Sequence, residues 1–381
     1  MRGLWCMCLV LAMIACSSEK PTQVDTVMEN GVEVVLNHIE PYRLKNSSVK
    51  LSVEREFSID FEREDLAKKG VSEILGYDVD SSGNIFCLCN AAIFKFDPKG
   101  NFLFKFSRKG QGPGEFSNPG RCAVSDSDEF WLFDSGKYRF ILFDQDGEFL
   151  KEDELKVQGD LWGYNQVYYL DDGKNIQMAA PLDFEEANPV YRLLVQDAKS
   201  GKIQAIPDQL EDENPMRSPR HNLLHEKLLY QVGQCNIYVY SQQNPQFEIN
   251  IYDYSGTPQR RIHKQYEKIR IDEEFKAKRW EWFKKHPMSR VHKMQGYFPD
   301  FYPPIKDFHV DSQGGIFVET YDKGEDPDAV VVDIFNPDGA YISRTTLTKS
   351  LSKRFKHDRL YALHEKESGF QELIVSSLGW D

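Results

Sequence analysis

Two histidines have the spacing that zinc sites use on helices. His221 and His225 lie four residues apart, and such a pair binds zinc when a third protein ligand joins it. No third ligand and no His-Glu-x-x-His motif is in view, so we interpret them as surface histidines on a short helix. The sequence also lacks a Gly-x-Ser-x-Gly motif, and its carboxylates are too numerous to single out a catalytic pair. It therefore predicts no catalytic residue, no metal site and no cofactor.

Basic residues near aromatic rings are the second pattern with chemical meaning. A guanidinium fork beside an apolar ring face suits a sugar or a carboxylate. Each basic residue could equally pair with one of the many acids, and the aromatic, Pro-rich residues 297–304 could either line a cleft or seal a helix onto the fold. The candidate ligand-binding residues are Arg108, Lys109, Arg121, Arg139, Trp162, Tyr297 and Tyr302.

Repeated β-hairpins are the elements that must position these residues. Residues 94–103 and 141–150 each run from an apolar strand through an Asp and a Gly into another apolar strand, and weaker copies occur at 194–201, 251–256 and 334–339. The Asp bonds the backbone of its own turn, and the Gly takes the positive φ angle that the turn requires. A second hairpin signal, Asp-x-x-Gly-Asn or a variant of it, precedes several copies, at 78–86, 169–176 and 308–317.

Two hairpins per unit make four strands, which is a propeller blade. The turn glycines are separated by 47, 54, 55 and 83 residues, so five blades are visible and the last interval holds an insertion. A sixth blade can be assembled from residues 49–53, 361–363 and 372–376, which would close the ring and remove exposed sheet edges. The carboxylates of the turns could alternatively bind calcium, but the closing acidic ligand of a calcium loop is missing.

The insertion, about residues 266–304, is predicted to contain a helix. Asp272 can cap the helix, Glu273 and Glu274 suit its positive end, and Pro287 stops it after His286. Phe275, Trp282 and Phe283 would share the packed face, with Trp280 pointing outward or sideways. Together these patterns predict an all-β fold, a six-bladed β-propeller with a helical insertion between the last blades.

The N-terminal residues indicate export. Residues 4–15 are apolar after Arg2, but this run is shorter than the roughly 20 residues that a membrane-spanning helix needs. Small Ala15, then Cys16 and two serines resemble a lipobox, and an ordinary secretory signal is the alternative. We therefore expect a lipoprotein signal peptide at 1–15, a lipidated Cys16 with a tether over 16–46, and the propeller over 47–381.

Charge and cysteine content narrow the classes of partner. The formal net charge is −13, which argues against nucleic acid because phosphate binding needs a clustered basic surface. The four cysteines that follow Cys16 are Cys87, Cys89, Cys122 and Cys235, and they are too sparse for a disulfide framework. Cys87 and Cys89 share one face of a strand and are expected to be small core residues.

The string Gly110-Gln111-Gly112-Pro113-Gly114-Glu115-Phe116 between two hairpins is not a phosphate loop, since Pro113 interrupts it and no helix follows. With the Phe-Asp-x-x-Gly hairpins it resembles the six-bladed β-propeller lipoproteins of Bacteroidetes, which are similar to NHL-repeat propellers. The resemblance covers nearly all of the chain after the signal peptide and implies fold and location more than activity.

Two functions follow as expectations. The favoured one is a non-catalytic binding or scaffolding lipoprotein in the cell envelope, at the periplasmic or surface face of the outer membrane, whose propeller mouth recognises a glycan, a peptide or an envelope protein. The alternative is a propeller enzyme, a lyase or a metal-dependent lactonase or hydrolase, with its site in the central channel.

Overall fold

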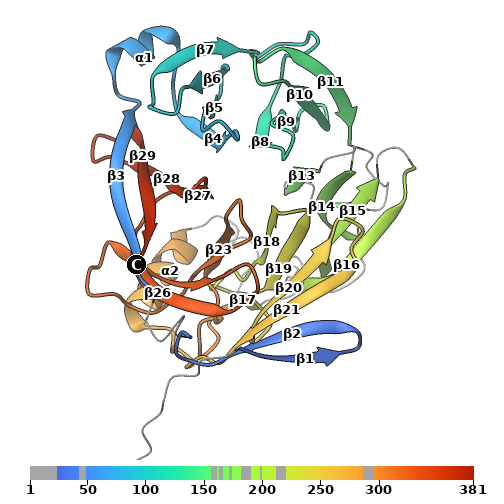
Figure 1. The fold of residues 1–381 in the computed structure, drawn as a ribbon, viewed down its shortest axis with the longest axis vertical. Helices are drawn as coiled ribbons and strands as arrows, with labels where there is room; N and C mark the ends of the chain where they lie inside the picture. Colours follow the sequence, from blue (N-terminus) through green and yellow to red (C-terminus); the bar gives the residue numbers. More distant parts are fainter. Residues whose placement is uncertain are drawn as a thin grey trace, which may run out of the picture.

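A computed structural model describes residues 24–42, 49–155, 161–162, 166–170, 174–181, 190–197, 200–211, 220–285 and 295–381. Six antiparallel blades surround one axis, and their innermost strands face the centre of the ring (Figure 1). The prediction of an all-β, six-bladed propeller is confirmed.

Blades 1 to 3 follow one another along the chain. Blade 1 comprises β4 (Ile74–Val79), β5 (Ile85–Cys89), β6 (Ile93–Phe96) and β7 (Phe102–Phe106). Blade 2 comprises β8 (Pro119–Val124), β9 (Phe130–Asp134), β10 (Arg139–Phe143) and β11 (Phe149–Glu154). Blade 3 comprises β12 (Leu161–Trp162), β13 (Val167–Tyr169), β14 (Lys174–Pro181), β15 (Val190–Asp197) and β16 (Ile203–Glu211).

Blades 4 and 6 each include strands from the N-terminal part of the chain: a hairpin extends blade 4, and a single strand completes blade 6. Blade 4 comprises β18 (Leu228–Gly233), β19 (Asn236–Ser241), β20 (Phe247–Asp253) and β21 (Pro258–Lys264), extended by β2 (Val32–Asn37) and β1 (Asp25–Glu29). Blade 5 comprises β23 (Asp307–Val310), β24 (Ile316–Glu319), β25 (Ala329–Phe335) and β26 (Tyr341–Thr348). Blade 6 comprises β27 (Ser352–Lys356), β28 (Arg359–Glu365), β29 (Gln371–Trp380) and β3 (Leu51–Asp60).

Blade 6 closes the ring with strands from both ends of the propeller. β3 pairs antiparallel with β29 in a register that places Leu51 opposite Trp380. This is the arrangement predicted from residues 49–53, 361–363 and 372–376. Because the N-terminal strand completes the last blade, the ring has no break between its first and last sheets.

An N-terminal hairpin adds to blade 4 and uses part of the segment expected as tether. β2 pairs parallel with β21, and the buried Asn37 amide donates to the carbonyl oxygens of His263 and Gly339 at 3.1 and 3.0 Å. The Asn37 side-chain oxygen accepts from the Tyr341 backbone N–H at 2.8 Å. This one side chain therefore ties the hairpin to blades 4 and 5.

The Asp-to-Gly turns have the local chemistry that was predicted for them. The Asp97 carboxylate accepts the backbone N–H groups of Lys99 and Asn101 at 2.9 and 2.8 Å, and the Asn101 amide at 2.8 Å. Gly100 has a φ angle of 80°. Asp80, Asp144, Asp253 and Asp311 accept backbone N–H groups in the same way, so their oxygens serve the turns.

Hydrophobic clusters fill the interfaces between neighbouring blades. Phe86 of blade 1 stacks on Phe130 of blade 2 with 5.2 Å between ring centroids, and Phe317 of blade 5 stacks on Phe355 of blade 6 at 3.9 Å. The core cysteines are part of this packing, since Cys87, Cys89 and Cys122 are buried, whereas Cys235 is exposed. Such aromatic pairs fix how each blade sits on the next.

The insertion between blades 4 and 5 contains the predicted helix, α2 (Glu273–Lys285). Asp272 caps it by accepting the backbone N–H of Phe275 at 2.9 Å. Phe283 is buried as expected, but the two tryptophans are exchanged relative to the prediction: Trp282 is 44% exposed, whereas Trp280 is half-buried and contacts Phe283 and Phe298. A shorter helix, α1 (Glu64–Lys69), precedes blade 1.

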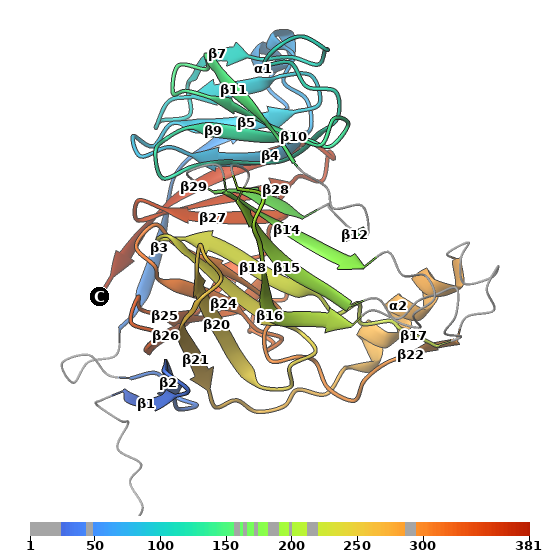
Figure 2. The ribbon, with the colours of Figure 1, turned by 90° about the vertical axis from the view of Figure 1, so that its right-hand side faces the viewer.

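Helix α2 lies at one face of the disc together with a parallel pair of short strands, β17 (Arg220–Asn222) and β22 (Gln295–Tyr297) (Figure 2). The C-terminal end of β29 lies at the opposite face. The α2 face is the one at which the inner strands begin and the second strands end, so the connections between blades open onto it. No helix of the described residues is long and apolar enough to cross a membrane.

Candidate functional site

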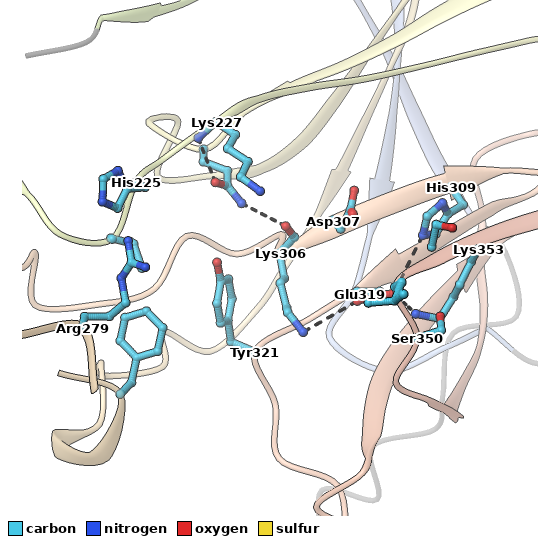
Figure 3. Close-up of a pocket in the computed structure, with 15 residues that line it drawn as sticks. His225, Lys227, Arg279, Lys306, Asp307, His309, Glu319, Tyr321, Ser350 and Lys353 are labelled. Carbon is cyan, nitrogen blue, oxygen red and sulfur yellow. Dashed lines mark hydrogen bonds and ion pairs between the residues drawn. The ribbon is translucent and has the colours of Figure 1, made fainter. Parts of the chain in front are cut away.

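A cavity of about 520 Å³ lies at the α2 face, between this helix and blades 4, 5 and 6. We call it the mouth pocket. Its charged and aromatic lining comes from the starts of inner strands, from loops that follow second strands, and from α2 (Figure 3). These side chains are Lys227, Arg279, Lys306, Asp307, His309, Glu319, Tyr321, Lys353, His225 and Phe275.

One buried amide holds the two lysine-bearing loops of the mouth pocket in place. Gln242 follows β19, and its side-chain nitrogen donates to the carbonyl oxygens of Ile305 and Lys306 at 3.1 and 3.0 Å. Its side-chain oxygen accepts the backbone N–H of Lys227 at 2.9 Å. The backbones that carry Lys227 and Lys306 are therefore fixed, while both ammonium groups remain on the pocket wall (Figure 3).

Helix α2 supplies a guanidinium to the opposite wall. Arg279 Nε donates to the carbonyl oxygen of Leu223 at 3.0 Å, and the guanidinium lies over the Trp282 ring at 4.8 Å from its centroid. Burial lowers the pKa of Arg279, although an arginine stays charged in proteins. The helix cap at Asp272 thus positions a cation that faces the lysines across the pocket.

An aromatic stack forms the wall between these cations. Tyr321 stacks on Tyr302 with 4.2 Å between centroids and an interplanar angle of 10°. Tyr302 in turn donates to the Asp272 carboxylate at 3.3 Å. The Tyr321 ring rises between Lys306 and Arg279 (Figure 3), and burial raises its pKa to about 12. Its hydroxyl therefore stays protonated and can donate a hydrogen bond near neutral pH.

Glu319 forms the acidic centre of the pocket floor. Lys353 Nζ lies 2.6 Å from Glu319 Oε1, and Lys306 and His309 lie 3.7 and 3.8 Å from the carboxylate. Burial disfavours ionisation of Glu319, but hydrogen bonding from His309 and the Lys353 ammonium outweigh it and lower the pKa to about 2. The carboxylate is thus already compensated by groups of the protein.

The predicted ligand-binding residues near the glycine-rich string hold that loop together. Arg108 Nε donates to Glu115 Oε1 at 2.6 Å, and Glu115 Oε2 accepts the Gly112 N–H at 2.9 Å. Lys109 is exposed and bridges to Phe116. Phe116 is fully buried, which confirms a tight connection between blades. Arg108 lines a different cavity of about 600 Å³ between blades 1 and 2.

The other predicted residues have separate roles. Arg139 is buried in ion pairs with Asp134 and Glu152, so it is a structural residue of blade 2. Arg121 lies on inner strand β8, where it reaches Tyr230 of blade 4. Tyr297 packs under the Arg220 guanidinium at 4.6 Å. Tyr302 supports the mouth pocket through Tyr321, and the Trp162 side chain and Cys16 lie outside the described residues.

The histidine pair has a different structure from the predicted short helix. Residues 220–222 form β17, which pairs with β22, because the Pro-rich segment after α2 offers it a strand partner. The rings of His221 and His225 lie 5.0 Å apart and pack on Phe283 and Trp282 of α2. The described residues hold no group of three His, Cys, Asp or Glu side chains arranged to bind a metal ion.

Sequence reasoning missed the cations that line the mouth pocket. Lys227 and Lys306 each immediately precede an inner strand, and Tyr321 follows a second strand, which are positions that the repeat pattern does mark. Arg279 shares the predicted packed face of the helix, because it lies four residues from both Phe275 and Phe283, and it is half-buried there. The signal that was available is therefore the position in the blade rather than the residue type.

Comparison with known proteins identifies the fold. The family model DUF5128, described as 6-bladed beta-propeller, matches residues 64–267. A protein of Bacteroides fragilis that is predicted to be exported matches with 12% identity and a TM-score of 0.50, over 91% of this chain and 99% of that one. A DUF4221 family member from Bacteroides vulgatus matches with 11% identity and a TM-score of 0.50, over 88% and 99%. No curated protein matches the chain.

Proposed function

The chain belongs to the DUF5128 family of 6-bladed beta-propeller proteins, and we propose that it is an exported binding protein whose mouth pocket takes a small carboxylate-bearing ligand, such as an acidic sugar. The observation that carries this proposal is the surplus of cations in the mouth pocket. The pocket is lined by four Lys or Arg residues and two Asp or Glu residues, on a chain with a net charge of −13.

The surplus of two cations remains after Glu319 is compensated internally. Lys353 and Glu319 neutralise each other at 2.6 Å, which leaves Lys227, Arg279 and Lys306 against Asp307. A concave site lined by positive charges attracts an anion and raises the rate at which the anion associates. A guanidinium also matches a carboxylate with two parallel hydrogen bonds.

Size and aromatic content favour a sugar-sized ligand. The 520 Å³ of the mouth pocket lies within the roughly 300–1,000 Å³ of small-molecule sites. Tyr321 combines an apolar ring with a protonated hydroxyl, which suits the mixed surface of a sugar. Catalysis is not needed to explain any of these groups.

The proposed location is the cell envelope, with Cys16 as the site of lipid attachment. Support comes from the apolar residues 4–15 and from Ala15-Cys16-Ser17-Ser18. The Bacteroides fragilis protein of the same fold is predicted to be exported, which agrees with this location. A glycan or another envelope component would meet the mouth pocket there.

The binding proposal is tested by calorimetric titration of the propeller with a uronic acid disaccharide and with its neutral counterpart. We expect saturable binding of the acidic sugar only, and a loss of at least ten-fold in affinity for Lys227→Gln combined with Arg279→Gln. Lys285→Gln, on the same helix but away from the pocket, is the matched control and should bind normally. Equal binding of the neutral sugar, or an unchanged double variant, would show the proposal to be wrong.

A further inference from the structure

Two arginines on inner strands differ from most other arginines of the propeller. Arg121 lies on β8 of blade 2 and Arg354 on β27 of blade 6. Arg55, Arg139, Arg260 and Arg344 all have a carboxylate oxygen within 4 Å. Neither Arg121 nor Arg354 has such a partner among the described residues.

Arg121 is held between two phenol rings. Its guanidinium carbon lies 5.2 Å from the centroids of both Tyr168 of blade 3 and Tyr230 of blade 4. One terminal nitrogen donates to the Tyr230 hydroxyl at 3.0 Å. Because a guanidinium has five N–H donors, this contact leaves most of them without a hydrogen bond to the described residues.

Arg354 approaches the same region from the other side of the ring. One nitrogen donates to the carbonyl oxygen of Lys353 at 3.0 Å, and its guanidinium lies 5.8 Å from the Tyr77 ring centroid. Burial disfavours its charge, but the attraction of Asp78 and Tyr77 raises its pKa. It therefore remains a cation, and most of its donors make no hydrogen bond within the part of the chain that the structure describes.

The two guanidiniums share neighbours. Burial and Asp78 raise the pKa of the Tyr168 hydroxyl, and the charges of Arg121 and Arg354 both oppose that rise. The same two charges act on the buried thiol of Cys122. The geometry agrees: Arg354 lies over Tyr77 of β4, and β4 lies beside β8, which carries Arg121, with Asp78 accepting the Val124 backbone N–H at 2.8 Å. The two guanidiniums therefore face one region, bounded by the inner strands of blades 1, 2, 3, 4 and 6.

Asp78, the buried carboxylate of this region, already has partners. Asp78 Oδ1 lies 3.0 Å from Lys356 Nζ, and its Oδ2 accepts the backbone N–H of Val124 at 2.8 Å. Burial disfavours its ionisation, but Lys356 and Arg354 lower its pKa. With Asp78 paired to Lys356 and Asp126 exposed, neither guanidinium has a carboxylate oxygen within 4 Å among the described residues.

We propose that Arg121 and Arg354, with the hydroxyls of Tyr168 and Tyr230, form a binding site for a tetrahedral oxyanion, a phosphate or sulfate group, on the axis of the propeller. The four side chains come from inner strands of blades 2, 3, 4 and 6, so they surround the axis from different sides, which suits a tetrahedral anion better than a planar carboxylate. The site is separate from the mouth pocket, since none of its four residues lines that cavity.

Titration calorimetry with inorganic phosphate and with sulfate, at constant ionic strength balanced by chloride, tests this site. We expect one anion per chain, binding at least ten-fold weaker in Arg121→Gln and in Arg354→Gln, and several-fold weaker in Tyr230→Phe. Arg192→Gln is the control, because Arg192 is exposed and contacts Gln209; it should bind as the wild type does. If Arg354→Gln does not fold, Arg121→Gln and Tyr230→Phe decide the outcome.

A crystal grown with selenate locates the anion directly. An anomalous peak between Arg121 and Arg354 supports the proposal. The proposal is overturned by an absence of saturable binding in the wild type, by unchanged binding in Arg121→Gln, or by a selenate peak in the mouth pocket alone. Acetate that binds as tightly as phosphate would overturn the preference for a tetrahedral anion.

Discussion

Lys353, on the inner strand of blade 6, places its ammonium 2.6 Å from the Glu319 carboxylate at the end of the second strand of blade 5. Both side chains are at least nine-tenths buried. The pair therefore joins two blades at the floor of the mouth pocket, and it links the electrostatics of that pocket to the stability of the ring.

Replacing Glu319 by Gln should destabilise the fold by about 3 kcal/mol, because it leaves the Lys353 charge buried without its partner. The pKa of Glu319 is lowered to about 2, so its ionic contribution is present above the unfolded value near 4.5 and is lost as the pH falls toward 2. Urea denaturation at pH 7 and pH 3 measures this. The pH dependence of stability should be smaller in Glu319→Gln; an identical dependence contradicts the assignment.

Replacing Gly100 by Ala should destabilise the contact between blade 1 and blade 6. A Cβ atom there would lie 2.8 Å from Phe57 Cε2, and the φ angle is 80°. We expect a cost of about 1–2 kcal/mol for the left-handed backbone and roughly 1–3 kcal/mol more for overpacking. Gly201→Ala is the matched control, with a φ angle of 71° and no atom within 4 Å. Equal losses in the two variants, measured by urea denaturation, would argue against the close packing.

Replacing Asp272 by Ala should loosen α2 and weaken ligand binding in the mouth pocket. The change removes the cap on the Phe275 N–H, which is worth roughly 1 kcal/mol, and the acceptor of the Tyr302 hydroxyl. Hydrogen exchange of the first-turn amides should become several-fold faster. Glu274→Ala, which removes only an exposed pair with Lys278, should have little effect. Unchanged exchange in Asp272→Ala would refute the role of the cap.

Replacing Cys16 by Ser should release the protein from the membrane if Cys16 carries the lipid. One acyl chain alone gives only marginal membrane binding, and stable anchoring needs a second, so loss of the lipidated cysteine should move the protein fully to the soluble fraction. Fractionation of cells and detection of the protein in each fraction measure this. Cys235→Ser provides the comparison and should remain with the membrane. A Cys16→Ser protein that still fractionates with membranes would disprove lipid anchoring.

The features that could be predicted from sequence are those that neighbouring residues determine. The Asp97 and Gly100 turn needs only contacts within five residues, and the Asp272 cap needs only the next turn of helix. Ring closure was also predictable, because a propeller without it would leave two strands unpaired. The β1–β2 hairpin was not, because blade 4 already has four strands of its own and the repeat pattern calls for no further pair beside β21.

The candidate site was harder to predict because the sequence does not show whether a given arginine or lysine pairs with a carboxylate of the protein or lines a pocket. Arg139 and Arg279 look alike in the sequence, yet Arg139 is neutralised by Asp134 and Glu152 from strands of its own blade. Arg279 lines the mouth pocket only because α2 packs over that pocket, where the Arg279 side chain donates a hydrogen bond to the Leu223 carbonyl oxygen. Tyr302 could either line a cleft or seal the helix onto the fold; in the structure it contacts Phe275 of α2 and stacks on Tyr321.

The pairing of β3 with β29 also constrains when the protein can fold. Leu51 of β3 pairs with Trp380 near the C-terminal end of β29. A chain that emerges from a ribosome therefore cannot complete blade 6 until β29 has been synthesised. Contacts this distant in sequence form slowly because the long loop must first be closed. The ring therefore stays open while the propeller is being synthesised, and it can close only after the last strand has been made.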